Sequence, residues 1–75
     1  MKISDLQDKN IININNGSNI GKISDLEINE EGIITSIYAM QSKFFLKIFS
    51  SNKETIFKMS DIKKIGEDVI LVQID

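Results

Sequence analysis

Short apolar runs separated by Asn, Gly and Ser set the pattern of this 75-residue chain. No stretch of about 11 or more residues keeps the apolar spacing of a helix face. Isoleucine is the most frequent residue, and its β-branched side chain packs well on a pleated sheet. The pattern therefore predicts six short strands, at residues 11–14, 20–28, 33–40, 44–49, 55–59 and 69–74.

Turn residues separate these predicted strands. Asn16-Gly17 follows the first strand, and this dipeptide favours a tight hairpin because both residues tolerate a positive φ. The segment 29–32 is the next predicted turn, and Gly32 suits a left-handed position within it. The strands are therefore expected to follow one another through tight turns, without helical crossovers.

A motif of the form apolar-Ser-Asp-apolar occurs at residues 3–6, 23–26 and 59–62. The first and third copies are expected to cap short helical turns, and the second lies in a predicted strand. Ser60 is the predicted N-cap of a turn over residues 60–65, which Gly66 ends. The copies are unequally spaced, which favours recurring local chemistry over an internal repeat.

The second predicted strand needs an irregularity. Ile23 would lie on one face of a regular strand, and Leu26 and Ile28 would lie on the other. A β-bulge at Ser24 or Asp25 would bring the three to one face. Gly21 in the same strand is consistent with tight curvature. Asp25 either contacts a ligand or accepts backbone hydrogen bonds at the bulge, and the second interpretation is preferred.

Together these elements predict a single all-β domain over residues 1–75. The expected fold is a small closed or partly open β-barrel of about six short antiparallel strands with short helical turns. Closure of such a sheet removes the exposed edges that favour aggregation.

Composition narrows the function. The chain has no cysteine and no histidine, which excludes disulfides and the Ser–His and Cys–His nucleophile pairs. We therefore expect no enzyme activity and no cofactor.

Nine lysines, no arginine and eleven acids give a net charge of −2 without a clustered basic face, so nucleic acid is not an expected partner. No run approaches the ~20 apolar residues of a membrane span. The start of the chain has no apolar signal segment, so a cytoplasmic location is expected.

The chain resembles a known family. Residues 21–29, the Glu31-Gly32 turn and the Ile-rich strand after it are similar to the first half of a PRC-barrel domain. Residues 1–7 and 62–72 resemble the YlmC/YmxH group of sporulation-associated PRC-barrel proteins, and the similarity covers essentially the whole chain. The resemblance implies a barrel of about six strands, a role as an interaction module, no catalytic residues and a link to endospore formation. It supplies no defined ligand.

The most suggestive candidate surface is aromatic. Phe44, Phe45 and Phe49 lie in a predicted strand that is apolar on both faces, and Ile37 lies in a strand with a similar two-sided pattern. Large apolar patches usually mark interfaces. We therefore predict a homodimer that uses these residues, with a further, unidentified protein partner. In the alternative interpretation, helical turns at the chain ends cover the second face.

Two polar segments have simpler interpretations. The oxygen-rich residues 27–31 lack the ligand spacing of an EF-hand calcium loop, so a solvated hairpin is favoured. Lys63-Lys64 could contact a phosphate, but a solvent-facing helical turn explains the pair without a ligand. The sequence therefore predicts a non-catalytic interaction or assembly module. A small-ligand or metal-binding regulatory protein is the alternative.

Overall fold

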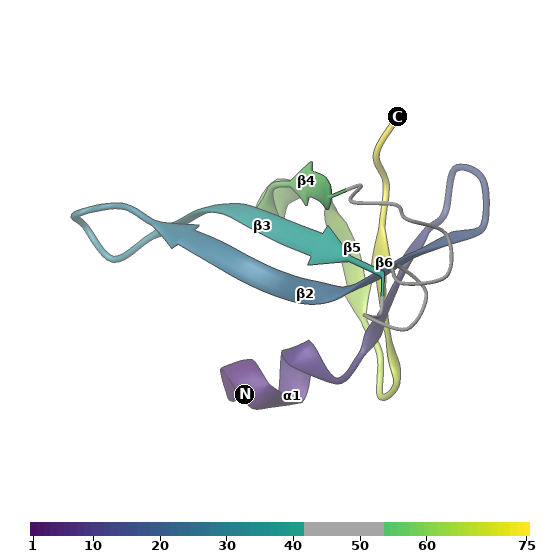
Figure 1. Cartoon of the computed structure of the whole chain (residues 1–75), viewed down its shortest axis with the longest axis horizontal. Helices are drawn as coiled ribbons and strands as arrows, with labels where there is room; N and C mark the ends of the chain where they lie inside the picture. The colour runs from purple at the N-terminus through teal and green to yellow at the C-terminus, as the bar shows by residue number, and fades with distance from the viewer. Residues whose placement is uncertain (42–53) are drawn as a thin grey trace.

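The computed structural model describes residues 1–41 and 54–75 and shows a curled β-sheet with a short helix beside it (Figure 1). The sheet has six strands in the order β4-β3-β2-β1-β6-β5. The elements along the chain are α1 (Ile3–Gln7), β1 (Asn10–Asn13), β2 (Ser18–Ile28), β3 (Ile34–Met40), β4 (Glu54–Phe57), the 3₁₀ helix η1 (Met59–Asp61), β5 (Ile62–Ile65) and β6 (Val69–Val72). The described chain is mostly β, as the sequence predicts.

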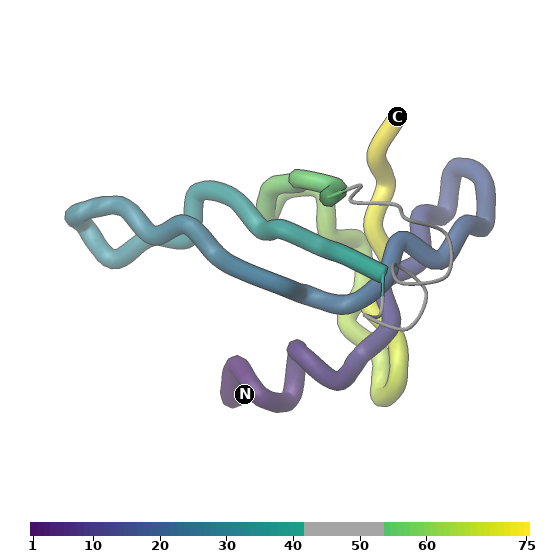
Figure 2. Tube along the Cα trace, viewed as in Figure 1, coloured from purple at the N-terminus to yellow at the C-terminus, as the bar shows by residue number. Residues whose placement is uncertain are grey.

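The connection between the two edge strands shows that the sheet curls. β4 and β5 lie at opposite ends of the strand order, yet only residues 58–61 join them. Such a connection spans at most about 18 Å. The edges of a flat six-stranded sheet would lie about 24 Å apart, since neighbouring strands are about 4.8 Å apart. The sheet therefore bends back toward itself along the path traced in Figure 2. Within the described residues no ladder joins β4 to β5, so this is the partly open form of the predicted barrel.

The middle of the sheet contains a parallel pair of strands. β1 runs parallel to β6, with Asn10 opposite Val69 and Asn13 opposite Val72, whereas the other neighbouring strands are antiparallel. The prediction that all strands are antiparallel is therefore wrong. The alternation of apolar positions assigns residues to a face but carries no information on strand direction. The long separation of β1 from β6 along the chain permits a parallel pair, which a tight hairpin cannot form.

The recurring motif closes two helical turns through its aspartate. In α1 the backbone N–H of Lys2 donates to Oδ2 of Asp5 at 2.9 Å. In η1 the N–H of Lys58 donates to Oδ2 of Asp61 at the same distance. The N-cap of this turn is therefore Lys58, and the prediction of Ser60 in that role is wrong. Asp61 lies three residues after this N-cap and accepts its backbone N–H, which is one half of a capping box.

The predicted helical turn over residues 60–65 is also too long. Only Met59–Asp61 is helical, and residues 62–65 form β5, which pairs antiparallel with β6. The two central residues of β5 are both lysines, so this strand lacks the alternation of apolar and polar residues by which a strand is predicted. The strand predicted at residues 44–49 lies outside the described residues.

Gly21 is the corner at which β2 changes partner. It lies opposite Ile11 of β1, whereas the next residue, Lys22, lies opposite Met40 of β3. Gly21 has a φ of 106°, and a Cβ placed on it would lie 2.0 Å from the carbonyl oxygen of Met40 and 2.8 Å from the backbone nitrogen of Gln41. Only glycine combines this conformation with so close a backbone approach. The expected curvature at Gly21 thus has a defined cause.

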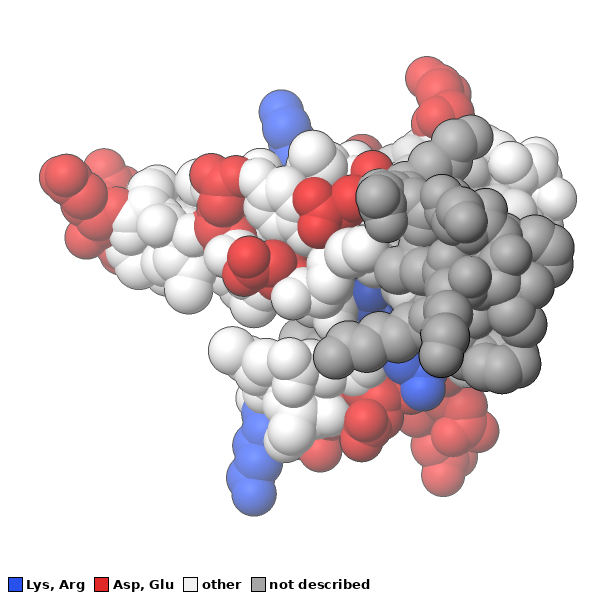
Figure 3. Space-filling model, in the orientation of Figure 1, with Lys and Arg blue, Asp and Glu red and all other residues white. Residues whose placement is uncertain are grey.

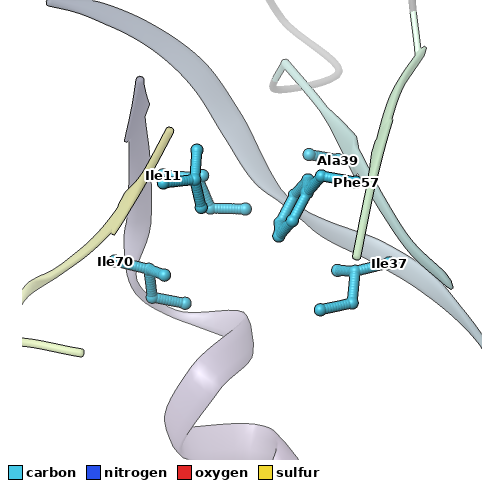
Figure 4. Close-up of a cluster of buried hydrophobic side chains, with 6 residues drawn as sticks. Ile11, Ile37, Ala39, Phe57 and Ile70 are labelled. Atoms are coloured by element: carbon cyan, nitrogen blue, oxygen red, sulfur yellow. The ribbon is translucent and has the colours of Figure 1, made fainter. Parts of the chain in front are cut away.

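A small apolar core fills the inside of the curled sheet. Its fully buried apolar side chains come from β1, β3, β4 and β6, and they are Ile11, Ile37, Ala39, Phe57, Ile70 and Val72. In Figure 4 Ile11 and Ile70 face Phe57 and Ile37 across this interior. Leu6 of α1 packs against the same cluster, which joins the helix to the sheet.

One buried polar side chain secures the C-terminal segment. Nδ2 of Asn13 donates to the carbonyl oxygen of Ile74 at 2.9 Å, and its Oδ1 lies 3.3 Å from the donating N–H nitrogen of Ile74. The same Oδ1 accepts from the backbone N–H of Asn15 at 3.1 Å. A buried amide is costly without partners, and here both ends of the amide are satisfied. Asn13 therefore fixes the chain after β6 against the turn after β1.

Candidate interaction surface

Three of the four residues predicted to form an interaction surface lie outside the described residues. These three are Phe44, Phe45 and Phe49. Ile37 is only 2% exposed and packs in the core with Ala39 and Phe57. Its assignment to an exposed surface is therefore corrected. The apolar residues on both faces of β3 misled the prediction, because alternation turns Ile37 and Ala39 inward while Tyr38 and Met40 remain half-buried on the other face.

The bulge expected at Ser24 or Asp25 lies at Ser24. Ile23 pairs with Ala39 and Asp25 pairs with Tyr38, so Ser24 is the additional residue on β2. Oγ of Ser24 lies 3.2 Å from the carbonyl oxygen of Tyr38 and 3.3 Å from Oε2 of Glu54. Its single proton can be donated to either of these two acceptors. Ser24 thereby joins β2 to β3 and β4.

Asp25 also serves the backbone at this bulge. Its Oδ1 accepts the backbone N–H of Leu26 at 2.8 Å, so the carboxylate stabilises the local irregularity. Asp25 is exposed, and Leu26 after it is half-buried against the core. The bulge thus brings Leu26 to the same inner face as Ile23. The expectation that Ile28 also turns inward is wrong, because a second register shift follows Glu27 and Ile28 is 58% exposed.

Asn29 builds the turn between β2 and β3. Its backbone N–H donates to the carbonyl oxygen of Ile33 at 2.9 Å, and its Oδ1 accepts the N–H groups of Glu31 and Ile33 at 2.9 and 3.0 Å. Gly32 has a φ of 82°, the left-handed conformation predicted for it, and its N–H donates to the carbonyl oxygen of Asn29 at 3.0 Å. The turn is therefore held by hydrogen bonds among its own residues.

Residues 25–36 form a projecting end of the β2–β3 hairpin, which we call the arm. It extends away from the remaining strands along the long axis of the molecule, which measures 39 Å against 24 Å in the other two directions (Figures 1 and 2). No residue of the arm is buried. Ile28 and Ile33 flank its turn and are 58% and 55% exposed. The arm thus presents large apolar side chains to solvent.

The base of the arm is held by polar contacts. The hydroxyl of Tyr38 donates to the carboxylate of Glu27, and Oγ1 of Thr35 donates to the carbonyl oxygen of Glu27 at 3.3 Å. A second register shift lies here, between Glu27 and Ile28 of β2. These contacts brace the hairpin where it leaves the core.

Charge is divided unequally between the arm and the rest of the chain. The arm contains none of the nine lysines and four of the eleven acids, which are Asp25, Glu27, Glu30 and Glu31. Its formal charge is therefore −4, whereas the remaining seven acids and nine lysines give the rest of the chain +2. Figure 3 shows the carboxylates distributed along the arm. No group of three or more acids in residues 1–41 and 54–75 is arranged to hold a metal ion.

The two edge strands expose different side chains. β5 exposes Lys63 and Lys64, which were expected on a helical turn, whereas β4 exposes Glu54 and Ile56. Lysines along an edge disfavour pairing with a second strand. The position of Lys63 and Lys64 therefore has a structural explanation that requires no phosphate.

Sequence reasoning did not identify the exposed pair Ile28 and Ile33. The signal was present, since an isoleucine stands on each side of the turn 29–32. Those isoleucines were assigned to strands with a buried face, and only the structure shows that the hairpin extends past the core.

A curled, partly open sheet of this topology defines the class of small β-barrel domains. The model of the PRC-barrel domain family matches residues 1–75, and this chain belongs to that family. The chain is 37% identical over 75 residues to "Probable sporulation protein YlmC" of Bacillus subtilis, across 99% of this chain and 93% of that protein. It is 39% identical over 74 residues to an uncharacterized protein of Clostridium acetobutylicum, across 97% of this chain and 84% of that protein. In the described part of the chain, no helix is long and apolar enough to cross a membrane.

Proposed function

We propose that this chain is a non-catalytic protein-interaction and assembly module that acts in sporulation. The observation that carries the proposal is the balance of apolar side chains. The described residues bury a core of six, yet leave seven large ones exposed, which are Met1, Ile3, Ile14, Ile28, Ile33, Ile56 and Met59. A chain this short has little interior to offer, so burial against a partner adds stability. The name of the Bacillus subtilis relative supports the setting.

The first partner in this proposal is a second copy of the chain. Phe44, Phe45 and Phe49 remain the predicted contact on sequence grounds, and Ile37 no longer belongs to it because it lies in the core. A two-fold dimer is the commonest assembly of soluble proteins.

Light scattering during serial dilution tests the dimer. The wild-type chain should show twice the 8.5 kDa mass of one copy, and the double variant Phe45→Asp and Phe49→Asp should show a single copy. Ile14→Asp is the control, because it adds a charge of the same sign at an exposed isoleucine in the turn after β1, outside the predicted contact. A wild-type chain that is strictly monomeric at micromolar concentration would contradict the dimer.

The sporulation role has its own test. In an endospore-forming host, deletion of the gene should lower the yield of heat-resistant spores, and the wild-type gene should restore it. The Phe45→Asp and Phe49→Asp variant should not restore it. An unchanged spore yield after deletion would count against the role. A fluorescent fusion in the same cells checks the proposed cytoplasmic location.

Native mass spectrometry separates this proposal from the alternative, a small-ligand or metal-binding regulatory protein. Freshly purified chain should show only masses of the protein and its assemblies. A bound non-protein mass at full occupancy would favour the regulator instead.

A further inference from the structure

We infer that the arm, residues 25–36, is a docking element for a different protein whose surface is basic and contains an apolar recess. This inference rests on the proposed function and deepens it, because it names the surface used and the chemistry of the partner.

The shape of the arm tip suits a recess. Ile28 lies opposite Ile34 across the hairpin. Ile33 directly precedes β3 on the other strand of the hairpin, and it is 55% exposed. Both strands of the tip therefore contribute exposed apolar surface, and a recess that surrounds the tip would bury more of it than a flat surface would.

The charge of the arm selects the partner. With four acids and no lysine, two arms placed together would oppose like charges, which disfavours a symmetric contact between arms. A basic surface reverses this repulsion and would also speed association at low salt. The acids lie beside the exposed isoleucines, so a complementary partner carries cations around an apolar centre.

The arm is prepared for binding before it meets a partner. The hydrogen bonds of Asn29 fix the turn, and the contacts of Tyr38 and Thr35 with Glu27 fix the base. An element that is already ordered loses less conformational entropy when it binds. The projection of the arm beyond the core also gives a partner access to both of its sides.

Two synthetic peptides of equal length and charge serve as probes, one with alternating Lys and Leu and one with alternating Lys and Ser. Fluorescence anisotropy measures their binding to the full chain. We expect the Lys–Leu peptide to bind the wild type at least about tenfold more tightly than the Lys–Ser peptide. The reason is that leucine side chains bury apolar surface against the isoleucines, whereas serine side chains bury little. The double variant Ile28→Ser and Ile33→Ser should reduce that ratio to about one, without changing affinity for the Lys–Ser peptide.

Ile14→Ser is the matched control. Ile14 is also exposed but lies in the turn after β1, outside the arm, so the ratio of affinities should stay at its wild-type value. The inference is overturned if the wild type binds both peptides equally, or if Ile14→Ser lowers the ratio as much as the arm variant does. Light scattering on the same samples gives a separate outcome. Loss of dimer mass in the arm variant would assign the arm to a second copy and overturn the basic partner, while leaving the proposed assembly function intact.

Discussion

The arm contains no buried isoleucine side chain, whereas buried isoleucines lie in the rest of the described chain, which we call the body. Ile11 and Ile70 of the body are fully buried, whereas Ile28 and Ile33 of the arm are more than half exposed. The body strands curl around a shared interior. The arm is a two-stranded ribbon that packs on this interior at Leu26 and Ile34, and its tip projects beyond it. A ribbon of two strands is marginally stable alone. Position relative to the curled sheet therefore decides whether an isoleucine is buried, and the arm depends on the body for its order.

The largest expected effect lies at the junction of the two regions. Gly21→Ala would place a Cβ 2.0 Å from a backbone oxygen in a residue with positive φ, so we expect a loss of about 4 kcal/mol or more, or failure to fold. Urea denaturation measures the free energy of unfolding. Gly32→Ala is the matched control in the arm, because its φ is also positive but nothing lies within 4 Å, and it should cost only about 1–2 kcal/mol. Equal losses in the two variants would show that the corner is not rigid.

The core of the body provides the next test. Phe57→Ala removes the largest side chain of the buried cluster and should lower the free energy of unfolding by about 3–5 kcal/mol. The contrasting substitution is Ile56→Ala on the same strand, which should cost less than about 1 kcal/mol because Ile56 is 57% exposed. If both variants lose the same stability, the assignment of inner and outer faces to β4 is wrong.

A smaller loss is expected where the body holds its C-terminal segment. Asn13→Ala removes the acceptor and donor that bind Ile74 and should cost about 1–3 kcal/mol. Hydrogen exchange followed by NMR should show faster exchange at the Ile74 amide. Asn15→Ala removes only an exposed hydrogen bond to the same carbonyl and should have little effect on that amide. Unchanged exchange in Asn13→Ala would contradict the proposed attachment.

The smallest effect is expected in the arm. The double variant Ile28→Ser and Ile33→Ser should change the free energy of unfolding by no more than about 0.5 kcal/mol for each residue, because neither side chain is buried. This near-neutrality separates a binding surface from a structural one. A loss of several kcal/mol would mean that the two isoleucines support the fold, and the contrast between arm and body would then fail.

Local features were predicted correctly from the sequence where a residue type or an apolar spacing is compatible with only one local backbone structure. The Asn16-Gly17 turn and the left-handed Gly32 follow from backbone requirements that few residues meet, and the bulge at Ser24 follows from the parity of the apolar positions in β2. The resemblance to the PRC-barrel family, drawn from residues spread over the whole chain, agrees with the family match. These conclusions depend on which residues stand at which positions along the chain, and not on contacts between distant segments.

Long-range packing produced the errors. The parallel pairing of β1 with β6 joins the two ends of the chain, and no local pattern encodes strand direction. Ile37 was assigned to a surface because its strand is apolar on both faces, and only the pairing of β3 with β2 and β4 shows which face is inside. Ile28 and Ile33 were missed for the converse reason, because their exposure depends on where the core ends.

The parallel ladder of β1 and β6 also has a consequence for the timing of folding. Residues 10–13 pair with residues 69–72, so each residue of β1 meets the residue 59 positions later in the chain. Before this ladder forms, β1 can pair with β2 alone. Contacts of such long sequence separation form late and slowly. Ile70 and Val72 are therefore expected to join the buried core late in folding, after the hairpins between neighbouring strands have formed.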